Sequence, residues 1–316
     1  MAADVADARA QEQGCKMLED TIRRCTNKQS QVASSGGLEA AMEAMVAHTG
    51  SEEVQLAASR ALYAMSCGNQ QSTLGLVSLG AIQTIVKAMT DHVSKEELQD
   101  VCCRVLRNAA ACNAECRAEV ASQGAVAAAL EALRAHPAAA SVQGAACQAL
   151  RDLAAYSAES QEEIFSRGGI QAVLRAMEGH RTSADVQVPA CGVLRNLAAG
   201  NPERQEVVVA RGGVQVLIDS MAFHAEAADV QWAGCWALFC ISARNPETAV
   251  DVAAHGAARA ALTAMRQHQK EARVQEAGAW VLKGLAPHLH AGPRPATALV
   301  ESAQAVLKAL EQHPGA

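Results

Sequence analysis

The sequence predicts an all-α protein in which similar layers of three helices stack into a solenoid. Three observations predict this fold class. Apolar residues make up 50% of the 316 residues but Trp, Tyr and Phe only 3%, which suits alanine-rich helical layers better than conventional globular cores. The chain repeats itself every 44 residues, as from Gly80 to Gly124. Each repeat carries helix start and stop signals at the same places.

The period is visible as columns of identical residues with no insertion between repeats. A glycine column reads Gly36, Gly80, Gly124, Gly168, Gly212 and Gly256. A leucine column reads Leu18, Leu62, Leu106, Leu150, Leu194, Leu238 and Leu282, and a glutamine column reads Gln11, Gln55, Gln99, Gln143, Gln187, Gln231 and Gln275. We therefore expect equivalent residues to take equivalent places in successive layers.

Residues 201–244 show how each repeat divides into helices. Asn201, Pro202 and Glu203 supply a cap, a residue tolerated at the first helical position and an acid in the first turn, so a short helix begins there. The glycines at 212 and 213 end it and allow a sharp turn. A second helix follows from Val214 to about His224, and a third, apolar nearly all round, runs from Val230 to about Ser242.

A short helix, a glycine hinge and two longer helices in each repeat resemble the armadillo family. The resemblance covers nearly the whole chain and is carried by residues 168–177, Gly-Gly-Ile-Gln-Ala-Val-Leu-Arg-Ala-Met, and by residues 190–201. The variant with Ala-Met-x-x-His before Val-Gln is similar to the armadillo regions of leucine-rich-repeat kinases and of small armadillo-only cytosolic proteins. The resemblance implies a right-handed superhelical solenoid whose third helices line a concave binding surface. HEAT repeats, which lack the short first helix and the hinge, are the alternative fold.

The ends of a solenoid must differ from its middle, because a terminal layer has a neighbour on one side only. We expect a single solenoid over 1–316. Residues 4–25 carry the third-helix register alone and are predicted to be a capping helix, residues 26–289 form six repeats, and residues 290–316 form a closing cap.

Stepping 100° per residue from the leucine column identifies outward positions on the third helices. All three tryptophans fall there in the last two full repeats, as Trp232, Trp236 and Trp280, and Phe239 lies at the edge of the same face. Tryptophan facing a groove is a typical anchor in protein recognition. The alternative is that these rings fill a tightly curved end of the stack or pack against the closing cap.

Polar residues of the same face are further candidates for partner binding, namely Arg104, Arg107, Asn108, Arg151, Arg195 and Asn196. Arginines suit carboxylates or phosphorylated side chains, but acids on the same columns make the face mixed, so a solvated surface is the alternative. In nuclear-import adaptors of the family, Trp and Asn recur in one repeat. Here Trp236 is matched with Cys240 and Asn196 with Gly192, which disfavours an adaptor for basic signal peptides.

Two columns could suggest metal or redox chemistry. Histidines end the second helices at His48, His92, His136, His180, His224 and His268, where contacts with carbonyls and the helix dipole explain them. Cys112 and Cys116, four residues apart, are a weak metal or redox signal. No nucleophile elbow, phosphate loop or HExxH motif is present, so we expect neither an enzyme nor a cofactor.

Composition limits the partners and the compartment. A net charge of −6 argues against nucleic acid, and the chain has no apolar run long enough to span a membrane and an acidic start unlike a signal peptide. We therefore expect a cytoplasmic protein, with the nucleus as the alternative.

The predicted function is a noncatalytic scaffold that holds an extended or helical segment of another protein in its concave groove. A regulatory armadillo module of a larger signalling assembly is a further alternative, and the end repeats could self-associate. The sequence does not name the partner, its pathway or its direction in the groove.

Overall fold

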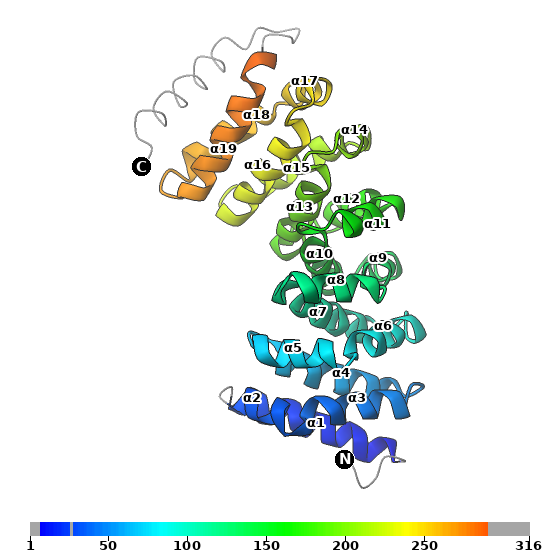
Figure 1. Cartoon of the computed structure of the whole chain (residues 1–316). Coiled ribbons are helices and arrows are strands. Elements are labelled where there is room, and N and C mark those ends of the chain that lie inside the picture. Colours follow the sequence, from blue (N-terminus) through cyan, green and yellow to red (C-terminus); the bar gives the residue numbers. More distant parts are fainter. Residues whose placement is uncertain (1–6, 26–27, 290–316) are drawn as a thin grey trace. The chain divides into compact units, whose positions relative to one another are not determined.

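The structure is a computed structural model that describes residues 7–25 and 28–289. Every regular element within these ranges is a helix (Figure 1). The chain divides into two compact units, residues 1–167 and 168–316, and each is described by itself. The segment 290–316, for which the sequence predicts a closing cap, lies outside the described residues.

The first unit begins with one long helix and continues with repeats of a short and two longer helices. Its elements are α1 (Ala8–Arg24), α2 (Gln29–Val32), a π-helical turn η2 (Ala33–Gly37), α3 (Leu38–Ala47), α4 (Glu52–Ser66), α5 (Gln70–Ser78), α6 (Ala81–Asp91), α7 (Glu96–Cys112), α8 (Ala114–Ser122), α9 (Ala125–Ala135), α10 (Ala140–Ala154) and α11 (Ala158–Ser166).

The second unit begins in the middle of a repeat, directly after its short helix. Its elements are α12 (Gly169–Gly179), α13 (Ala184–Ala198), α14 (Pro202–Ala210), α15 (Gly213–Phe223), α16 (Ala228–Ser242), α17 (Pro246–Ala254), α18 (Ala257–Gln267), α19 (Ala272–Leu285) and a 3₁₀ turn η3 (Ala286–His288). The helices predicted for residues 201–244 are confirmed as α14, α15 and α16, although α16 begins two residues before the predicted start.

The short first helices begin at side-chain caps. Asn69, Asn113 and Asn201 each accept a hydrogen bond from the backbone N–H three residues later, which satisfies one of the donors left free at a helix start. Pro202 follows its cap at a position where no N–H is needed.

The glycine column supplies the hinge between the first and second helices. Gly80 and Gly212 have φ of +75°, in the left-handed region that residues with a Cβ rarely adopt. The chain can therefore leave one helix and enter the next with only two residues between them, so two helices fit into about 20 residues.

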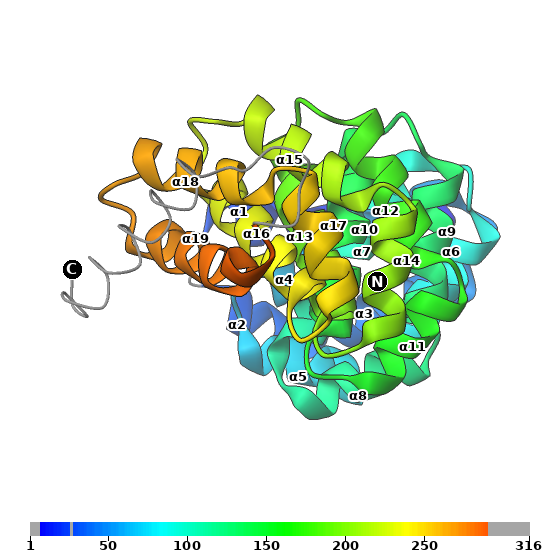
Figure 2. The same cartoon turned by 90° about the horizontal axis from the view of Figure 1, so that it is seen from above.

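Equivalent helices of successive repeats lie side by side in rows. In the first unit the third-helix row is α1, α4, α7 and α10, and the second-helix row is α3, α6 and α9 (Figure 1). In the second unit the third-helix row is α13, α16 and α19, and the second-helix row is α12, α15 and α18, which can also be followed in Figure 2. The leucine column lies between the rows, and Leu106, Leu194 and Leu238 are fully buried.

The glutamine column closes the C-terminal ends of the second helices. Gln231, only 2% exposed, donates through Nε2 to the backbone carbonyls of Met221 and His224, at 2.7 and 2.8 Å. Gln143 binds Leu133 and His136 in the same way. Met221 lies in the last turn of α15, where a carbonyl lacks a donor within the helix, so the buried amide satisfies it, whereas the His224 carbonyl also accepts from the backbone N–H of Ala227.

Candidate functional site

The aromatic residues predicted as an anchor lie together on α16 and α19 of the second unit. We call Trp232, Trp236, Phe239 and Trp280 the aromatic strip. The Phe239 ring lies between two indoles, with centroid distances of 5.6 Å to Trp236 and 5.5 Å to Trp280. The Trp236 contact is edge-on at 75°, a geometry that the ring quadrupoles favour. These three rings therefore form one cluster across two neighbouring helices.

The aromatic strip is ordered by packing but still reaches solvent. Trp280 is 40% exposed, whereas Trp232, Trp236 and Phe239 are half-buried. Gly284 faces Phe239 without a side chain, since a Cβ added there would lie in van der Waals contact with the ring, at 3.8 Å. An apolar side chain from another molecule could therefore contact rings whose positions are already fixed.

Cationic groups lie over two of the indoles. The guanidinium carbons of Arg195 and Arg273 are 5.9 and 5.8 Å from the Trp232 ring centre, and the Lys283 ammonium is 5.1 Å from that of Trp280. Each distance is within the range of a cation–π contact. The cations hold the indoles in place and give the strip positive charge.

Among the described residues, only one of these three cations has a carboxylate partner. Arg273 forms an ion pair with Asp229, at 2.5 Å. Arg195 donates through Nε to the side-chain oxygen of Asn196, at 3.3 Å, and forms no ion pair with a carboxylate of the described residues. Lys283 likewise forms none within the described ranges. Asn196, a predicted binding residue, thus supports Arg195.

The arginines predicted on the first unit's third helices are paired with acids of the same unit. Arg104 contacts both carboxylate oxygens of Asp100, at 3.0 Å each. Asp152 receives Arg151 at 2.7 Å and lies 3.7 Å from Arg107. The three arginines share two carboxylates, so most of their charge is met within the unit and this row is a weaker candidate for binding acidic groups than the residue types alone suggested.

Asn108, also on α7, is used inside the fold. Its side-chain amide donates to the Ser66 hydroxyl of α4, at 3.1 Å. The predicted site residues therefore fall into two sets, one in each unit. Only the second unit's set combines rings with cations that lack a carboxylate partner among the described residues.

The sequence analysis did not single out Arg273 in the second unit or Tyr63 in the first. Arg273 lies one turn outside the helical columns that were considered, although its 44-residue spacing from Asp229 indicated that the two residues are neighbours in adjacent layers.

Tyr63 stands in the same edge column as Arg107. It lines a pocket between α1, α4 and α7 together with Arg60, Arg104 and Cys67. Burial, and then the neighbouring Cys67, raise the pKa of Tyr63. The charges of Arg60 and Arg104 are again met by acids, Glu97 and Asp100.

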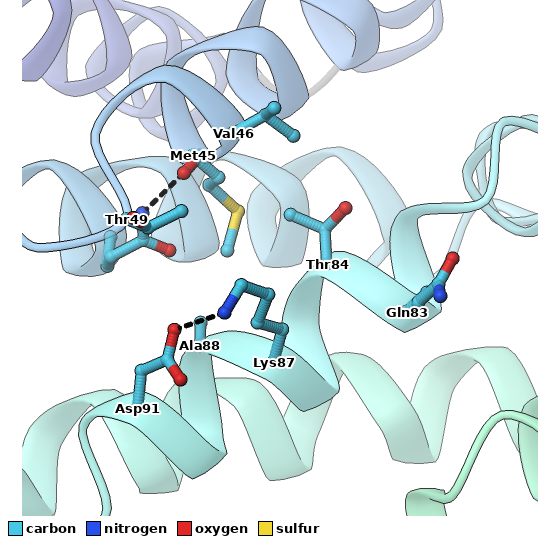
Figure 3. Close-up of a pocket in the computed structure, with 9 residues that line it drawn as sticks. Met45, Val46, Thr49, Gln83, Thr84, Lys87, Ala88 and Asp91 are labelled. Carbon is cyan, nitrogen blue, oxygen red and sulfur yellow. Dashed lines mark hydrogen bonds and ion pairs between the residues drawn. The ribbon is translucent and has the colours of Figure 1, made fainter.

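A pocket in the second-helix row of the first unit lies between α3 and α6 (Figure 3). Met45 and Val46 provide its apolar side, and Lys87 and Asp91 form an ion pair at 2.7 Å on the other side. The two charges neutralise each other, so the pocket offers no charged group to a ligand.

The histidine column contacts the preceding repeat. His92 and His136 place Nε2 at 2.7 Å from the backbone carbonyls of Thr49 and Val93. No group of three or more His, Cys, Asp or Glu residues within 7–25 and 28–289 is arranged to hold a metal ion. Cys116 is buried beside Cys112, and burial followed by the neighbouring thiol raises the pKa of Cys116 to about 11.

Membrane-spanning potential is limited to one bent pair of helices. Among the described helices, none is by itself both long and apolar enough to cross a bilayer, while α5 and α6 together pass the length and composition test across a 76° bend.

Comparisons with known proteins agree on the fold. A family model described as LRRK2 ARM repeat matches residues 110–291. No curated protein matches the chain. A crystal structure of an engineered protein has a TM-score of 0.68 at 24% identity, covering 78% of this chain and 98% of that one.

Two further solved structures are similar. A designed armadillo repeat protein in complex with the peptide (KR)4 has a TM-score of 0.64 at 22% identity, covering 76% of this chain and 98% of that one. A structure concerning a phosphorylation switch in the interaction between cadherin and beta-catenin has a TM-score of 0.74 at 19% identity, covering 95% of this chain and 56% of that one. At these identities the likeness establishes the fold, which is the armadillo type that the sequence predicted.

Proposed function

Since this chain belongs to the LRRK2 ARM repeat family, we propose that it is a noncatalytic interaction module that holds a segment of another protein along its third helices. The observation that carries the proposal is the cluster of Trp236, Phe239 and Trp280. Trp280 exposes 40% of its surface although an exposed indole contributes little to folding. Partly exposed, well-packed aromatic rings are the side chains that dominate binding energy at protein interfaces.

The aromatic strip serves as the anchor for an apolar side chain of the partner segment. Trp236 and Trp280 come from different helices and both contact Phe239, so a side chain inserted beside Phe239 meets both indoles. The partner thus gains a site that is preorganised, and little side-chain entropy is lost on binding. We place this interaction in the cytoplasm.

An affinity purification with matched variants tests the proposal. The tagged full chain is compared with a Trp236→Ala, Trp280→Ala double variant and with Phe223→Ala as control. Phe223 is a 60% exposed aromatic residue on α15, in the second-helix row, so its loss removes exposed ring area away from the strip. We expect specific proteins that are retained by the wild type and by Phe223→Ala and lost with the double variant.

Binding and stability must be measured separately, because packing within the fold is the competing role of the rings. For a partner identified in this way, each single tryptophan variant should weaken binding by about 2 kcal/mol or more. The melting temperature of Trp280→Ala should remain within a few degrees of the wild type. An unchanged set of retained proteins, or a loss of stability equal to the loss of binding, would contradict the proposal.

A nuclear-import type of adaptor for basic signal peptides is a second candidate that the site chemistry disfavours. Arg195 and Lys283 lie over the indoles that would have to receive lysine side chains, and like charges repel. Tight binding of a basic import-signal peptide to the full chain at moderate salt would restore this candidate. A regulatory role within a larger signalling assembly is compatible with the interaction module proposed above.

A further inference from the structure

We infer that the segment held by the aromatic strip is acidic, with carboxylate side chains on either side of an apolar residue. This inference rests on the proposed function and adds the chemistry of the partner. It comes from the difference between the two third-helix rows, since Arg104 and Arg151 in the first unit are neutralised by Asp100 and Asp152. Arg195 and Lys283 in the second unit have rings, and no described carboxylate, within contact distance.

The two cations lie at opposite ends of the strip. Trp232, Trp236 and Phe239 follow one another along α16, and seven residues of helix rise about 10 Å. Arg195 is over Trp232 at one end. Lys283 is over Trp280, which packs against Phe239 at the other end. The rings therefore fill the space between two positive charges.

This spacing predicts a pattern in the partner. An extended segment advances about 3.3 Å per residue, so 10 Å corresponds to about three residues. With an aliphatic or aromatic residue over Phe239, a side chain about three positions along the segment lies near Trp232 and Arg195, and a side chain on the other side of that residue lies near Trp280 and Lys283. Aspartate or glutamate at those positions forms ion pairs, whereas lysine or arginine there meets like charge.

A cation–π contact does not use up the charge of the cation. An exposed contact of this kind stabilises by about 0.5–1 kcal/mol and leaves the outer side of the guanidinium or ammonium in water. A carboxylate can then bind from the solvent side while the cation stays over the ring. Arg273 contributes less, because Asp229 already neutralises it.

One neighbouring carboxylate and the net charge of the chain both oppose binding of an acidic segment, and this decides which variants the test needs. Glu276 is exposed on α19, one turn before Trp280, and repels a carboxylate near the strip. The chain as a whole carries a net charge of −6, so long-range repulsion and local attraction are screened by salt together. Salt dependence alone therefore does not identify the local contribution, and single-charge variants are needed.

Selection from a random peptide library tests the inference with the full-length chain. Phage-displayed 12-residue peptides are selected on the wild type and counter-selected on the Trp236→Ala, Trp280→Ala double variant, so that only strip-dependent peptides remain. We expect these peptides to contain at least about twice as much Asp and Glu as the starting library, around an apolar residue.

Synthetic versions of one selected peptide then measure the charge preference by fluorescence anisotropy. Replacing its acidic residues by serine should weaken binding at least about fivefold, and replacing them by lysine should weaken it further. In an Arg195→Gln, Lys283→Gln double variant, the acidic and serine peptides should differ by less than about twofold. Glu276→Gln should strengthen binding of the acidic peptide about two- to threefold. Arg266→Gln removes one exposed cation from α18 of the same unit and should leave the dissociation constant within about twofold.

The outcomes separate this inference from the proposed function. Strip-dependent peptides that are neutral or basic, or acidic peptides indifferent to Arg195→Gln, Lys283→Gln, overturn the acidic partner and leave the interaction module standing. A failure to recover any strip-dependent peptide overturns the proposed function itself. Sedimentation that shows a dimer lost in the tryptophan double variant identifies a second copy of the chain as the occupant, which also overturns the acidic segment.

Discussion

The imidazole Nε2 of His92 lies 2.7 Å from the backbone carbonyl oxygen of Thr49, 43 residues earlier in the chain. The accepting carbonyl belongs to the turn that follows the second helix of the preceding repeat, so the ring ties two adjacent layers together. His224 and His268 make the same contact with Arg181 and Ala225 within the second unit. The sequence analysis explained this column by carbonyl contacts and the helix dipole, and the contacted carbonyls belong to the neighbouring repeat.

Loss of one such ring should weaken the attachment of one layer to the next. We expect His92→Ala to lower the free energy of unfolding by about 1 kcal/mol, the usual net value of one hydrogen bond. Urea unfolding followed by circular dichroism measures the change. His255→Ala is the control, because His255 is exposed and contacts a carbonyl of its own helix. Equal effects of the two variants would argue against an interlayer role.

The buried glutamine column should be more sensitive than the histidines. Gln231→Leu keeps a similar volume and leaves the Met221 carbonyl without its donor, while the His224 carbonyl keeps the backbone N–H of Ala227. A buried unsatisfied group costs about 1–3 kcal/mol, so we expect a loss of about 1–3 kcal/mol in unfolding free energy. Gln215→Leu, at an exposed position on α15, should change stability by less than about 0.5 kcal/mol. A loss below about 1 kcal/mol for Gln231→Leu would contradict the proposed closure of the helix end.

Much of the fold could be predicted because the repeat period determines it. The glycine column predicted the hinges, and Gly80, Gly124 and Gly212 all have positive φ. The rotation of 100° per residue also predicted that Trp236 and Trp280, equivalent residues of adjacent layers, occupy one face, and both contact Phe239. Positions 44 residues apart are neighbours in the stack, so spacing alone gave their proximity.

The charge pattern of the site could not be predicted in the same way. Arginine side chains are long and can reach acids in their own helix or in the next layer. Arg104 pairs with Asp100 in its own helix, and Arg107 approaches Asp152 on the neighbouring helix. Counting acidic and basic residues therefore predicted a face of mixed charge. Which of its cations form ion pairs depends on side-chain conformations that no spacing rule determines.

The hinge glycines allow a test of backbone strain alone. Gly212 has φ of +75°, and a Cβ added there would meet no atom within 4 Å. Gly212→Ala should therefore destabilise the fold by about 1 kcal/mol through the left-handed conformation and not through a clash. Gly50 is the matched control, since its Cβ would also meet open space and its φ lies outside the left-handed region. Thermal unfolding of both variants should show a loss for Gly212→Ala only.

The leucine column should carry a larger share of stability than any polar contact. Leu194 is fully buried in α13, so Leu194→Ala creates a cavity between helices. We expect a loss of about 2–5 kcal/mol in the free energy of unfolding, measured by urea titration with an unchanged m-value. Val46→Ala, at a residue that is 64% exposed, should cost less than about 0.5 kcal/mol. A loss below about 1 kcal/mol for Leu194→Ala would refute its place in the core.

The buried cysteines predict how stability depends on alkaline pH. Burial raises the pKa of the Cys191 and Cys235 thiols to about 12, from an ordinary value of 9.0. The folded chain keeps these protons up to about pH 12, whereas the unfolded chain releases them above about pH 9. Their contribution to stability is therefore complete below pH 9 and is lost as the pH rises from 9 towards 12, by about 1.4 kcal/mol per pH unit for each thiol.

Urea unfolding between pH 8 and pH 10.5 measures this slope. Cys191→Ala lowers the free energy of unfolding at every pH by opening a cavity. It should also make the decline of that free energy above pH 9 shallower, by about 1.4 kcal/mol per pH unit. Cys25→Ala removes an exposed thiol and is the control for loss of a cysteine outside the core. The same burial should keep Cys191 and Cys235 unreactive towards a thiol reagent at pH 8 while Cys67 reacts. An identical alkaline slope in the Cys191→Ala variant and the wild type would mean that burial of this thiol does not hold its proton.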